Sequence, residues 1–226
     1  MRWKKCEEGW NEMKSKILLI GGGGHCKSVL DSLLELNEFS EIGIIDKSKN
    51  IGKVIMGVPI VGEDDDLISL FDEGYNYAFV TIGSIGNPTL RIKFFHRLIE
   101  IGYKIPVIID NSARVSKNAI IEQGVFIGKQ TVVNAGAMIQ RGAIINSGSI
   151  VEHDCQIGAF AHVAPGAVLG GEVVVGEHSH IGSNATIKQQ IHIGSNSIIG
   201  MGSVVVKNIT SSVIAYGNPC REVKKL

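Results

Sequence analysis

The spacing of apolar residues divides the chain into two parts with different periods. Between residues 16 and 109, short apolar runs alternate with amphipathic segments. The runs KILLIGG, IGIID, YAFVTIG and KIPVIID predict strands, and residues 27–36, 63–73 and 89–101 predict helices. Strands and helices in alternation are typical of a parallel sheet of Rossmann type. We therefore expect residues 14–108 to form a Rossmann-like α/β domain.

From Ile109 onward the period becomes six. Every sixth residue as far as Val205 is aliphatic, at seventeen consecutive positions. Four places after each aliphatic residue the side chain is usually small, as at Ala143 and Ala161. A short fixed period with a large and a small inward position is typical of a β-solenoid, whose stacked coils bury a continuous core. Residues 109–226 are therefore predicted to form a β-helix with a C-terminal tail. If three hexads make one coil, residues 18 apart stack about 4.8 Å from one another.

Charge and composition exclude several classes of function. Basic and acidic residues each number 22, and no long basic cluster suggests a nucleic-acid partner. No apolar run approaches the ~20 residues of a membrane span, and an N-terminus containing Glu7, Glu8 and Glu12 does not read as a signal peptide. We expect a cytoplasmic protein. The segment MKSKILLIG looks like a natural start at Met13, so residues 1–13 are predicted to be a flexible extension.

The segment IVEHDCQI contains a histidine between two acids. In the hexad that begins at Val151, His153 is third and points outward at a corner, whereas Cys155 occupies the small inward position and is predicted to be core filler. Eighteen residues further on, the same corner is Gly171, which leaves room for a ligand beside the imidazole. Asp154 can fix the tautomer of His153 or stabilise its imidazolium. His153 thus reads as a general base, and the alternatives are a solvated surface histidine and a metal ligand.

A metal site is the weakest of these readings. His162 and His180 lie 18 residues apart and stack on one another, but neither shares the column of His153. The four cysteines are far apart and include no Cys-x-x-Cys pair, so they suggest neither a zinc site nor a disulfide framework. We therefore expect no metal.

The opening GGGGHCKSV, the uninterrupted hexads, the coil NSGSIVEHDCQIG and the closing YGNPCREVKK resemble the NeuD-like and PglD-like sugar O- and N-acetyltransferases. These enzymes belong to the hexapeptide-repeat acyltransferases, whose β-helix is left-handed. The resemblance covers the chain from Lys14 and implies acetyl-CoA as co-substrate and a homotrimer with active sites at subunit interfaces. It also implies that His153 is the general base and that Asp154 orients it. The residues implied to contact acetyl-CoA near the thioester are Asn146, His162 and, through its backbone donor, Gly171.

The glycine-rich turn GGGGHC follows a strand and opens a helix, where amides can meet a phosphate. It does not fit the dinucleotide fingerprint, because the third glycine position falls on Cys26. Asp46 ends the second strand, where it would suit a ribose hydroxyl or a uracil edge, and Lys47 stands where relatives often have a second acid. Tight turns alone would also explain Gly83. The predicted nucleotide-sugar-binding residues are Gly23, Gly24, His25, Asp46, Lys47, Gly83 and Ser84.

Together these features predict transfer of acetyl from acetyl-CoA to the amino group of a UDP- or GDP-linked amino-deoxysugar, by direct attack with histidine as base. CoA is expected in a groove between β-helices, where it contacts Gly194, Gly200 and Gly202. His162 is expected to reach the site of His153 across the subunit interface. O-acetylation of a sialic-acid-like sugar stays open, because the same base serves both reactions. A non-catalytic nucleotide-sugar-binding scaffold is the alternative from another class.

Overall fold

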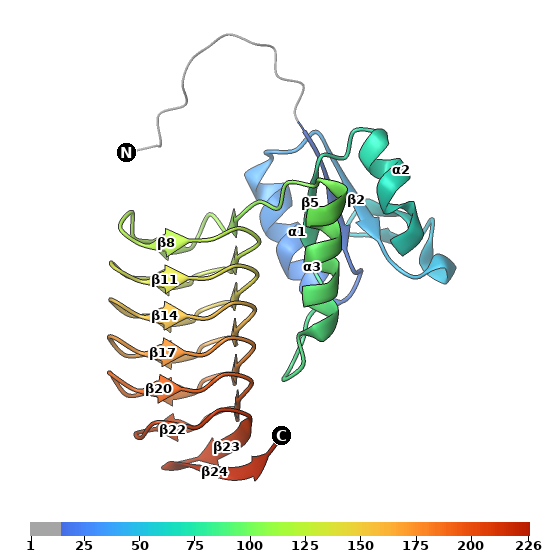
Figure 1. Ribbon diagram of the computed structural model, residues 1–226. Coiled ribbons are helices and arrows are strands. Elements are labelled where there is room, and N and C mark those ends of the chain that lie inside the picture. Colours follow the sequence, from blue (N-terminus) through green and yellow to red (C-terminus); the bar gives the residue numbers. More distant parts are fainter. Residues whose placement is uncertain (1–14) are drawn as a thin grey trace.

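The computed structural model describes residues 15–226, so the predicted flexible extension lies outside the described residues. An N-terminal α/β domain lies against one side of a long β-helix (Figure 1). The α/β sheet has the strand order β3-β4-β2-β1-β5. Its strands are β1 (Lys16–Ile20), β2 (Glu41–Ile45), β3 (Val54–Ile55), β4 (Val58–Gly62) and β5 (Tyr77–Val80), and its helices are α1 (Gly24–Leu36), α2 (Leu67–Asp72) and α3 (Thr89–Ile101), with the 3₁₀ turns η1 (Ser48–Asn50) and η2 (Asp64–Asp66).

The central strand of this sheet is β1, which pairs in parallel with β2 and β5. All side chains of β1 from Ile17 to Ile20 are buried, as expected for a strand covered on both faces. Parallel pairing and helical crossovers confirm the predicted α/β class. The hairpin of β3 and β4 is an element that the hydrophobic pattern did not predict. It turns at Met56 and Gly57, which both have positive φ, and the pair lacks the Asn-Gly or Asp-Gly signal of such turns.

The run KIPVIID does not form the predicted last strand of the α/β sheet. Lys104 alone makes a parallel bridge to Tyr77. Ile108 and Ile109 instead form β6, which pairs with β9 in the β-helix. The run therefore contacts the α/β sheet at its first residue and the β-helix at its end. A short apolar segment predicts a strand but does not show which strand it will pair with.

The six-residue period produces three parallel sheets of two-residue strands, and consecutive strands belong to consecutive sheets. One sheet contains β7 (Arg114–Val115), β10 (Val132–Val133), β13 (Ile150–Val151), β16 (Val168–Leu169), β19 (Thr186–Ile187) and β22 (Val204–Val205). The second contains β8 (Ile120–Ile121), β11 (Met138–Ile139), β14 (Gln156–Ile157), β17 (Val174–Val175) and β20 (His192–Ile193).

The third sheet faces the α/β domain and is the longest. It contains β6 (Ile108–Ile109), β9 (Phe126–Ile127), β12 (Ile144–Ile145), β15 (His162–Val163), β18 (His180–Ile181), β21 (Ile198–Ile199), β23 (Val213–Gly217) and β24 (Cys220–Lys225). The last two strands form an antiparallel hairpin at the C-terminal end. The pairing of His162 with His180 shows the predicted 18-residue stacking. The fold is an α/β domain followed by a left-handed parallel β-helix, as predicted.

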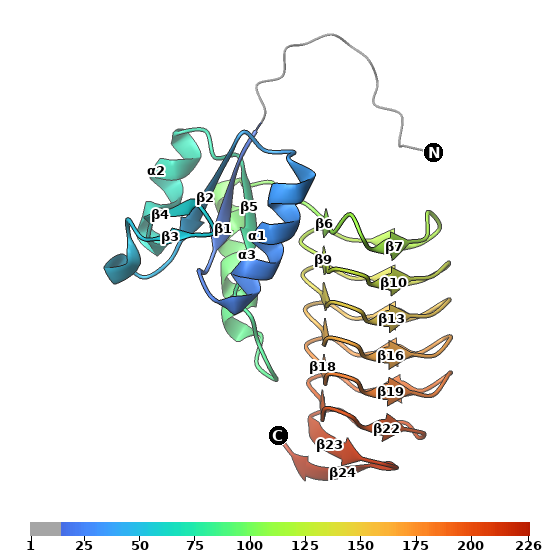
Figure 2. The same cartoon turned by 180° about the vertical axis from the view of Figure 1, so that it is seen from behind.

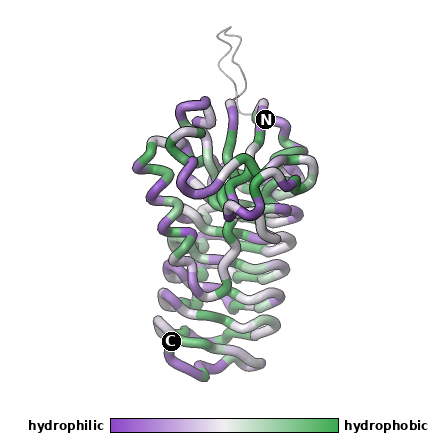
Figure 3. Tube along the Cα trace, turned by 90° about the vertical axis from the view of Figure 1, so that its right-hand side faces the viewer, coloured by the Kyte–Doolittle hydropathy of each residue, from purple (hydrophilic) through white to green (hydrophobic). Residues whose placement is uncertain are grey.

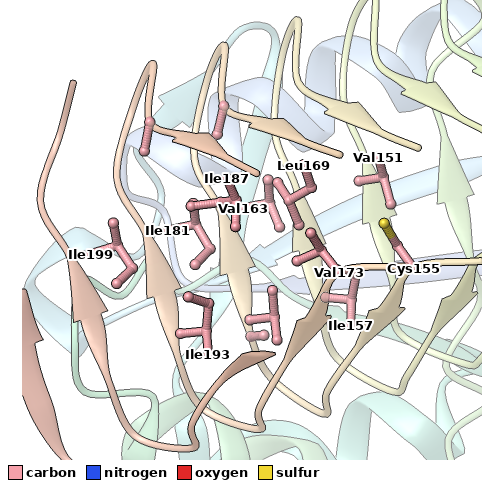
Figure 4. Close-up of a cluster of buried hydrophobic side chains, with 14 of the residues drawn as sticks. Val151, Cys155, Ile157, Val163, Leu169, Val173, Ile181, Ile187, Ile193 and Ile199 are labelled. Atoms are coloured by element: carbon pink, nitrogen blue, oxygen red, sulfur yellow. The ribbon is translucent and has the colours of Figure 1, made fainter. Parts of the chain in front are cut away.

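The inward aliphatic residues form one continuous column inside the β-helix (Figure 4). Cys155 lies among them, fully buried, and burial raises the pKa of its thiol to about 11. Only the first aliphatic positions, such as Ile109, are partly exposed, because no coil covers them. Along each coil, apolar stretches alternate with polar ones (Figure 3).

The two domains share apolar and polar contacts. Phe126 and Ile144 point outward from the third sheet into the core beneath α1. Beside them, Ser32 Oγ of α1 donates to Asp110 Oδ2 at 2.6 Å, and Lys129 forms ion pairs with Asp31 and Glu35 of the same helix. These contacts fix the α/β domain against the third sheet.

Candidate active site

His153 lies in the turn between β13 and β14. Its side chain is 58% exposed, and its Nδ1 lies 2.9 Å from Asp154 Oδ2. Asp154 has a positive φ of 59°, the left-handed conformation that residues at the same place of other turns share, such as Phe160 and Glu172. This hydrogen bond is the main reason why the pKa of His153 is raised above 6.5. Because the carboxylate accepts the Nδ1 hydrogen, the lone pair of the neutral ring is on Nε2.

Gly171 lies one coil away and provides the space beside that nitrogen. A Cβ at this position would lie 2.5 Å from His153 Nε2. The neighbouring amides are used within the β-helix, Gly170 N–H by Ile187 O and Glu172 N–H by His153 O. Within residues 15–226, the N–H of Gly171, a partly buried residue, has no acceptor. An unpaired backbone donor among the described residues therefore belongs to the same glycine that leaves space beside the ring nitrogen.

Glu152, the other acid beside His153, has a structural partner. Its Oε2 accepts a hydrogen bond of 2.9 Å from Asn134 Nδ2 one coil away. This carboxylate therefore braces two coils, and Asp154 is the acid that contacts His153.

A second group of polar residues lies where the third sheet meets the α/β domain. His162 Nδ1 lies 3.2 Å from the carbonyl oxygen of Ser84, which follows β5. Its Nε2 lies 3.3 Å from Asn146 Nδ2, and Asn146 Oδ1 accepts the Ser147 N–H at 2.8 Å. Burial is the main cause that lowers the pKa of His162 to about 3, and His180 adds to it. His162 is therefore a neutral hydrogen-bonding group.

Two other imidazoles lie near His162. His180 packs edge to face against it, with ring centroids 4.8 Å apart, and His25 packs against Phe126. Burial and then Arg91 lower the pKa of both, in the case of His25 to about 4. The buried atoms His25 Nε2 and His180 Nδ1 have no hydrogen-bond partner among the described residues.

A groove of about 280 Å³ runs from His162 along the third sheet toward the C-terminus. Its wall is mostly apolar and includes the strongly exposed side chains Ile85 and Met201. Gly200 lines this groove, although a Cβ there would meet Tyr216. The Cβ position of Gly194 is filled by Ser211, and Gly202 has positive φ with open space around it. These three predicted CoA contacts thus have different surroundings, and Gly194 serves the stacking of coils.

The predicted sugar-side residues gather at the carboxyl ends of the α/β strands. Gly23 and Gly24 begin α1, and no atom lies within 4 Å of their Cβ positions. Gly83 lies beside His25, since a Cβ at Gly83 would be 3.5 Å from the Cβ of His25. Asp46 directly follows β2, and its Oδ1 accepts the Lys47 N–H at 2.7 Å. Open glycines and an acid at one sheet edge are typical of nucleotide sites.

A cleft of about 670 Å³ adjoins Asp46 and Lys47. It is also lined by Lys93 and Arg97 of α3, which the sequence analysis did not single out. Their helical spacing looked like an ordinary solvated face, so no local signal distinguished them.

The structure does not bring His153 and His162 together within one chain. His153 lies between the first and second sheets, whereas His162 lies on the third. The turns that join β13 to β14 are on the side of the β-helix away from the α/β domain (Figures 1 and 2). Asn146 and the sugar-side residues lie with His162, and only Asp154 and Gly171 lie with His153.

Residues 15–226 contain no group of three or more His, Cys, Asp or Glu side chains arranged to hold a metal ion. None of the helices in this range has the length and apolar character needed to cross a membrane.

Comparison with known families gives three matches along the chain. Residues 16–98 match the PglD N-terminal domain, residues 103–181 the GMPPB C-terminal domain, and residues 172–207 the bacterial transferase hexapeptide repeat. A search of curated proteins found no match.

Several solved structures are similar over nearly the whole chain. The acetyltransferase domain of PglB from Neisseria gonorrhoeae, in complex with acetyl coenzyme A, is 35% identical, with a TM-score of 0.87 over 93% of this chain and 100% of that one. A mutant perosamine N-acetyltransferase from Caulobacter crescentus, in complex with CoA and GDP-perosamine, is 34% identical, with a TM-score of 0.87 over 93% of this chain and 98% of that one. WeeI from Acinetobacter baumannii is 26% identical, with a TM-score of 0.82 over 92% and 100%. The chain therefore belongs to the NeuD/PglD-like sugar acetyltransferases of the hexapeptide-repeat family.

Proposed function

We propose that this protein transfers acetyl from acetyl-CoA to the amino group of a UDP- or GDP-linked amino-deoxysugar. The α/β domain, residues 14–108, would bind the nucleotide sugar, and the β-helix domain, residues 109–226, would bind acetyl-CoA. The observation that carries the proposal is the turn of His153, where Nδ1 is hydrogen bonded to Asp154 and Nε2 faces the space left by Gly171. The N-acetyl rather than O-acetyl reaction is favoured by the likeness to perosamine N-acetyltransferase.

The reaction follows from these groups. The amine nitrogen attacks the thioester carbonyl carbon, and the oxyanion that forms accepts a hydrogen bond from the Gly171 N–H. His153 Nε2 takes the proton that the nitrogen loses, while Asp154 stabilises the imidazolium through Nδ1. The C–S bond then breaks, and the CoA sulfur takes up a proton. A base of this kind contributes about 10²–10⁴-fold, and one oxyanion donor about 10²–10³-fold.

The separation of His153 from His162 supports a homotrimer with shared active sites. One chain has the base on one side of the β-helix and the sugar-side residues on another, so a complete site needs a second copy. Partly buried apolar side chains on the outward face of the first sheet offer a surface for it, interrupted by the exposed Thr186: Val132, Ile150, Val168 and Val204. In this arrangement His162, Asn146 and the groove beside them would meet His153 of a neighbour. Gly23, Gly24, His25, Asp46, Lys47, Gly83 and Ser84 would hold the sugar nucleotide.

The direct test is thiol release from acetyl-CoA with a panel of UDP- and GDP-linked amino-sugars and free sialic acids. We expect release with a nucleotide amino-sugar and its loss in the folded variant His153→Ala. Release with sialic acids alone would make the protein an O-acetyltransferase. No release with any acceptor, together with a melting temperature that acetyl-CoA does not change, would leave a nucleotide-sugar-binding scaffold.

A further inference from the structure

Arg91, in the first turn of α3, is a buried cation. Its side chain is 3% exposed, and no carboxylate within residues 15–226 forms an ion pair with it. Its Nη2 donates to the carbonyl oxygens of Gly142 at 2.7 Å and Phe160 at 3.0 Å, both in the β-helix. Because a buried charge costs free energy that only well-placed hydrogen bonds offset, each bond of this guanidinium matters for its position.

The remaining bond of Arg91 goes to the sugar side. Its Nη1 donates to Ser84 Oγ at 3.3 Å. The carbonyl oxygen of the same serine lies 3.2 Å from His162 Nδ1. Ser84 is therefore held at two points, by the α/β domain's own arginine and by a histidine of the β-helix. The adjoining residues Gly83 and Ile85 are exposed.

These contacts determine the tautomer of His162. A carbonyl oxygen only accepts, so Nδ1 carries the hydrogen that bonds to Ser84. The Oδ1 of Asn146 is occupied by the Ser147 N–H, so its Nδ2 donates to the bare Nε2 of His162. The ring is thus oriented by one acceptor and one donor. Displacement of Ser84 would remove the acceptor and free the ring to change tautomer or rotate.

We propose that Arg91 is a positioning residue that holds Ser84 against His162 and so couples the sugar-side loop to the acyl-side histidine. The role in catalysis rests on the proposed function, in which the groove beside His162 holds the acyl group and Ser84 borders the sugar site. The conformation of the loop between β5 and α3 then decides whether His162 has its Nδ1–H tautomer. The nearby charge of Arg91 supports the same state, because it disfavours protonation of His25, His162 and His180.

The first test uses Ser84→Ala, which removes the hydroxyl bond to Arg91 and leaves the bonds of Arg91 to the β-helix in place. Ser84→Thr keeps a hydroxyl and serves as the conservative variant. We expect Ser84→Ala to lower kcat about tenfold, the scale of a small misplacement of a reacting group, with KM for acetyl-CoA unchanged. Ser84→Thr should restore most of the rate. Arg91→Lys, which keeps the charge but has no planar fork, should resemble Ser84→Ala.

The second test reads the tautomer directly, by NMR of the ring nitrogens of His162. The wild-type protein should give a single Nδ1–H tautomer, and Ser84→Ala and Arg91→Lys should give a mixture. Glu100→Gln, on the exposed side of the same helix, is the control and should change neither the rate nor the spectrum. A wild-type kcat together with an unchanged tautomer in both variants would overturn the proposal. If the wild-type protein releases no thiol, the proposed function fails, but the spectra still decide whether Arg91 positions His162.

Discussion

The substitution Gly171→Ala tests the geometry of the proposed base with one methyl group. The added Cβ would lie 2.5 Å from His153 Nε2 and 2.6 Å from Cε1. Since non-bonded carbon contacts are comfortable at about 3.5–4.0 Å, the imidazole must move by about 1 Å. The ring is exposed and can rotate, but it then leaves both Asp154 and the space where the amine would lie. A displacement of this size costs about 10²-fold in rate, so we expect kcat to fall by that factor.

The fold should not suffer from this change. Gly171 is not among the glycines with positive φ, so alanine fits its backbone, and the loss of chain entropy in the unfolded state favours the variant by about 0.4–1 kcal/mol. The Gly171 N–H is also retained. We therefore expect lower activity with an equal or slightly higher Tm, measured by thiol release and thermal unfolding. In the His153→Ala background the same methyl group should cause no further fall in kcat. A wild-type kcat in Gly171→Ala, or an equal further loss in that background, would refute the role of this corner.

Three other predictions follow from named contacts. Because Asp154 raises the pKa of His153, the neutral base is lost as pH falls through a value above 6.5. Asp154→Asn should therefore move the acid limb of the kcat/KM profile to lower pH and reduce its plateau. An acid limb that does not move would contradict the role of Asp154. Mixing His153→Ala with His162→Asn subunits should restore about a quarter of wild-type activity in randomly assembled trimers, whereas sites confined to one chain would give none. Asp110→Ala should destabilise the protein by about 3 kcal/mol near pH 7, because Ser32 and Ser112 lose an ionised acceptor. Burial alone would raise the pKa of Asp110, but these hydrogen bonds lower it below 3.8. The difference in urea-unfolding free energy between the wild-type protein and Asp110→Ala should therefore shrink as pH falls below 3.8 and Asp110 becomes protonated.

The sequence predicts the β-helix better than any other part, because its information is local. Each aliphatic position repeats every six residues and stacks on its own copy 18 residues away, as Val151 does on Leu169. The same register puts His153 beside Gly171, so this pair is predictable from counting. The left hand of the helix and the roles of Asn146 and His162 came instead from family resemblance. Counting also stacks Glu152 on Asn134, 18 residues away, but it does not show that their side chains form a hydrogen bond, since side-chain direction at a corner depends on the backbone conformation there.

Contacts between the domains are what the sequence does not predict. Arg91 resembles any polar residue of an amphipathic helix, and its bonds to Gly142 and Phe160 join segments at least 51 residues apart. KIPVIID reads as a strand of the α/β sheet, yet its end begins the β-helix, because two partners compete for the same apolar run. Pairings of this kind are decided by how whole domains pack, which no local period encodes.

The placement of the polar groups explains why one chain would need its neighbours. The α/β domain covers part of the third sheet, so Phe126 and Ile144 are buried beneath it, and His162 is partly buried and held neutral. A general base must titrate near working pH and reach the substrate, which requires an exposed imidazole with an acid partner. Such a residue is His153, which is 58% exposed in the turn between β13 and β14, on the side of the β-helix away from the α/β domain. A neighbouring subunit whose sugar-side loop packs against this corner would bring the acceptor sugar to His153 and would exclude water from the site. On this reasoning the isolated monomer keeps its fold and its Asp154–His153 pair but lacks a complete site, so specific activity should fall on dilution below the assembly range.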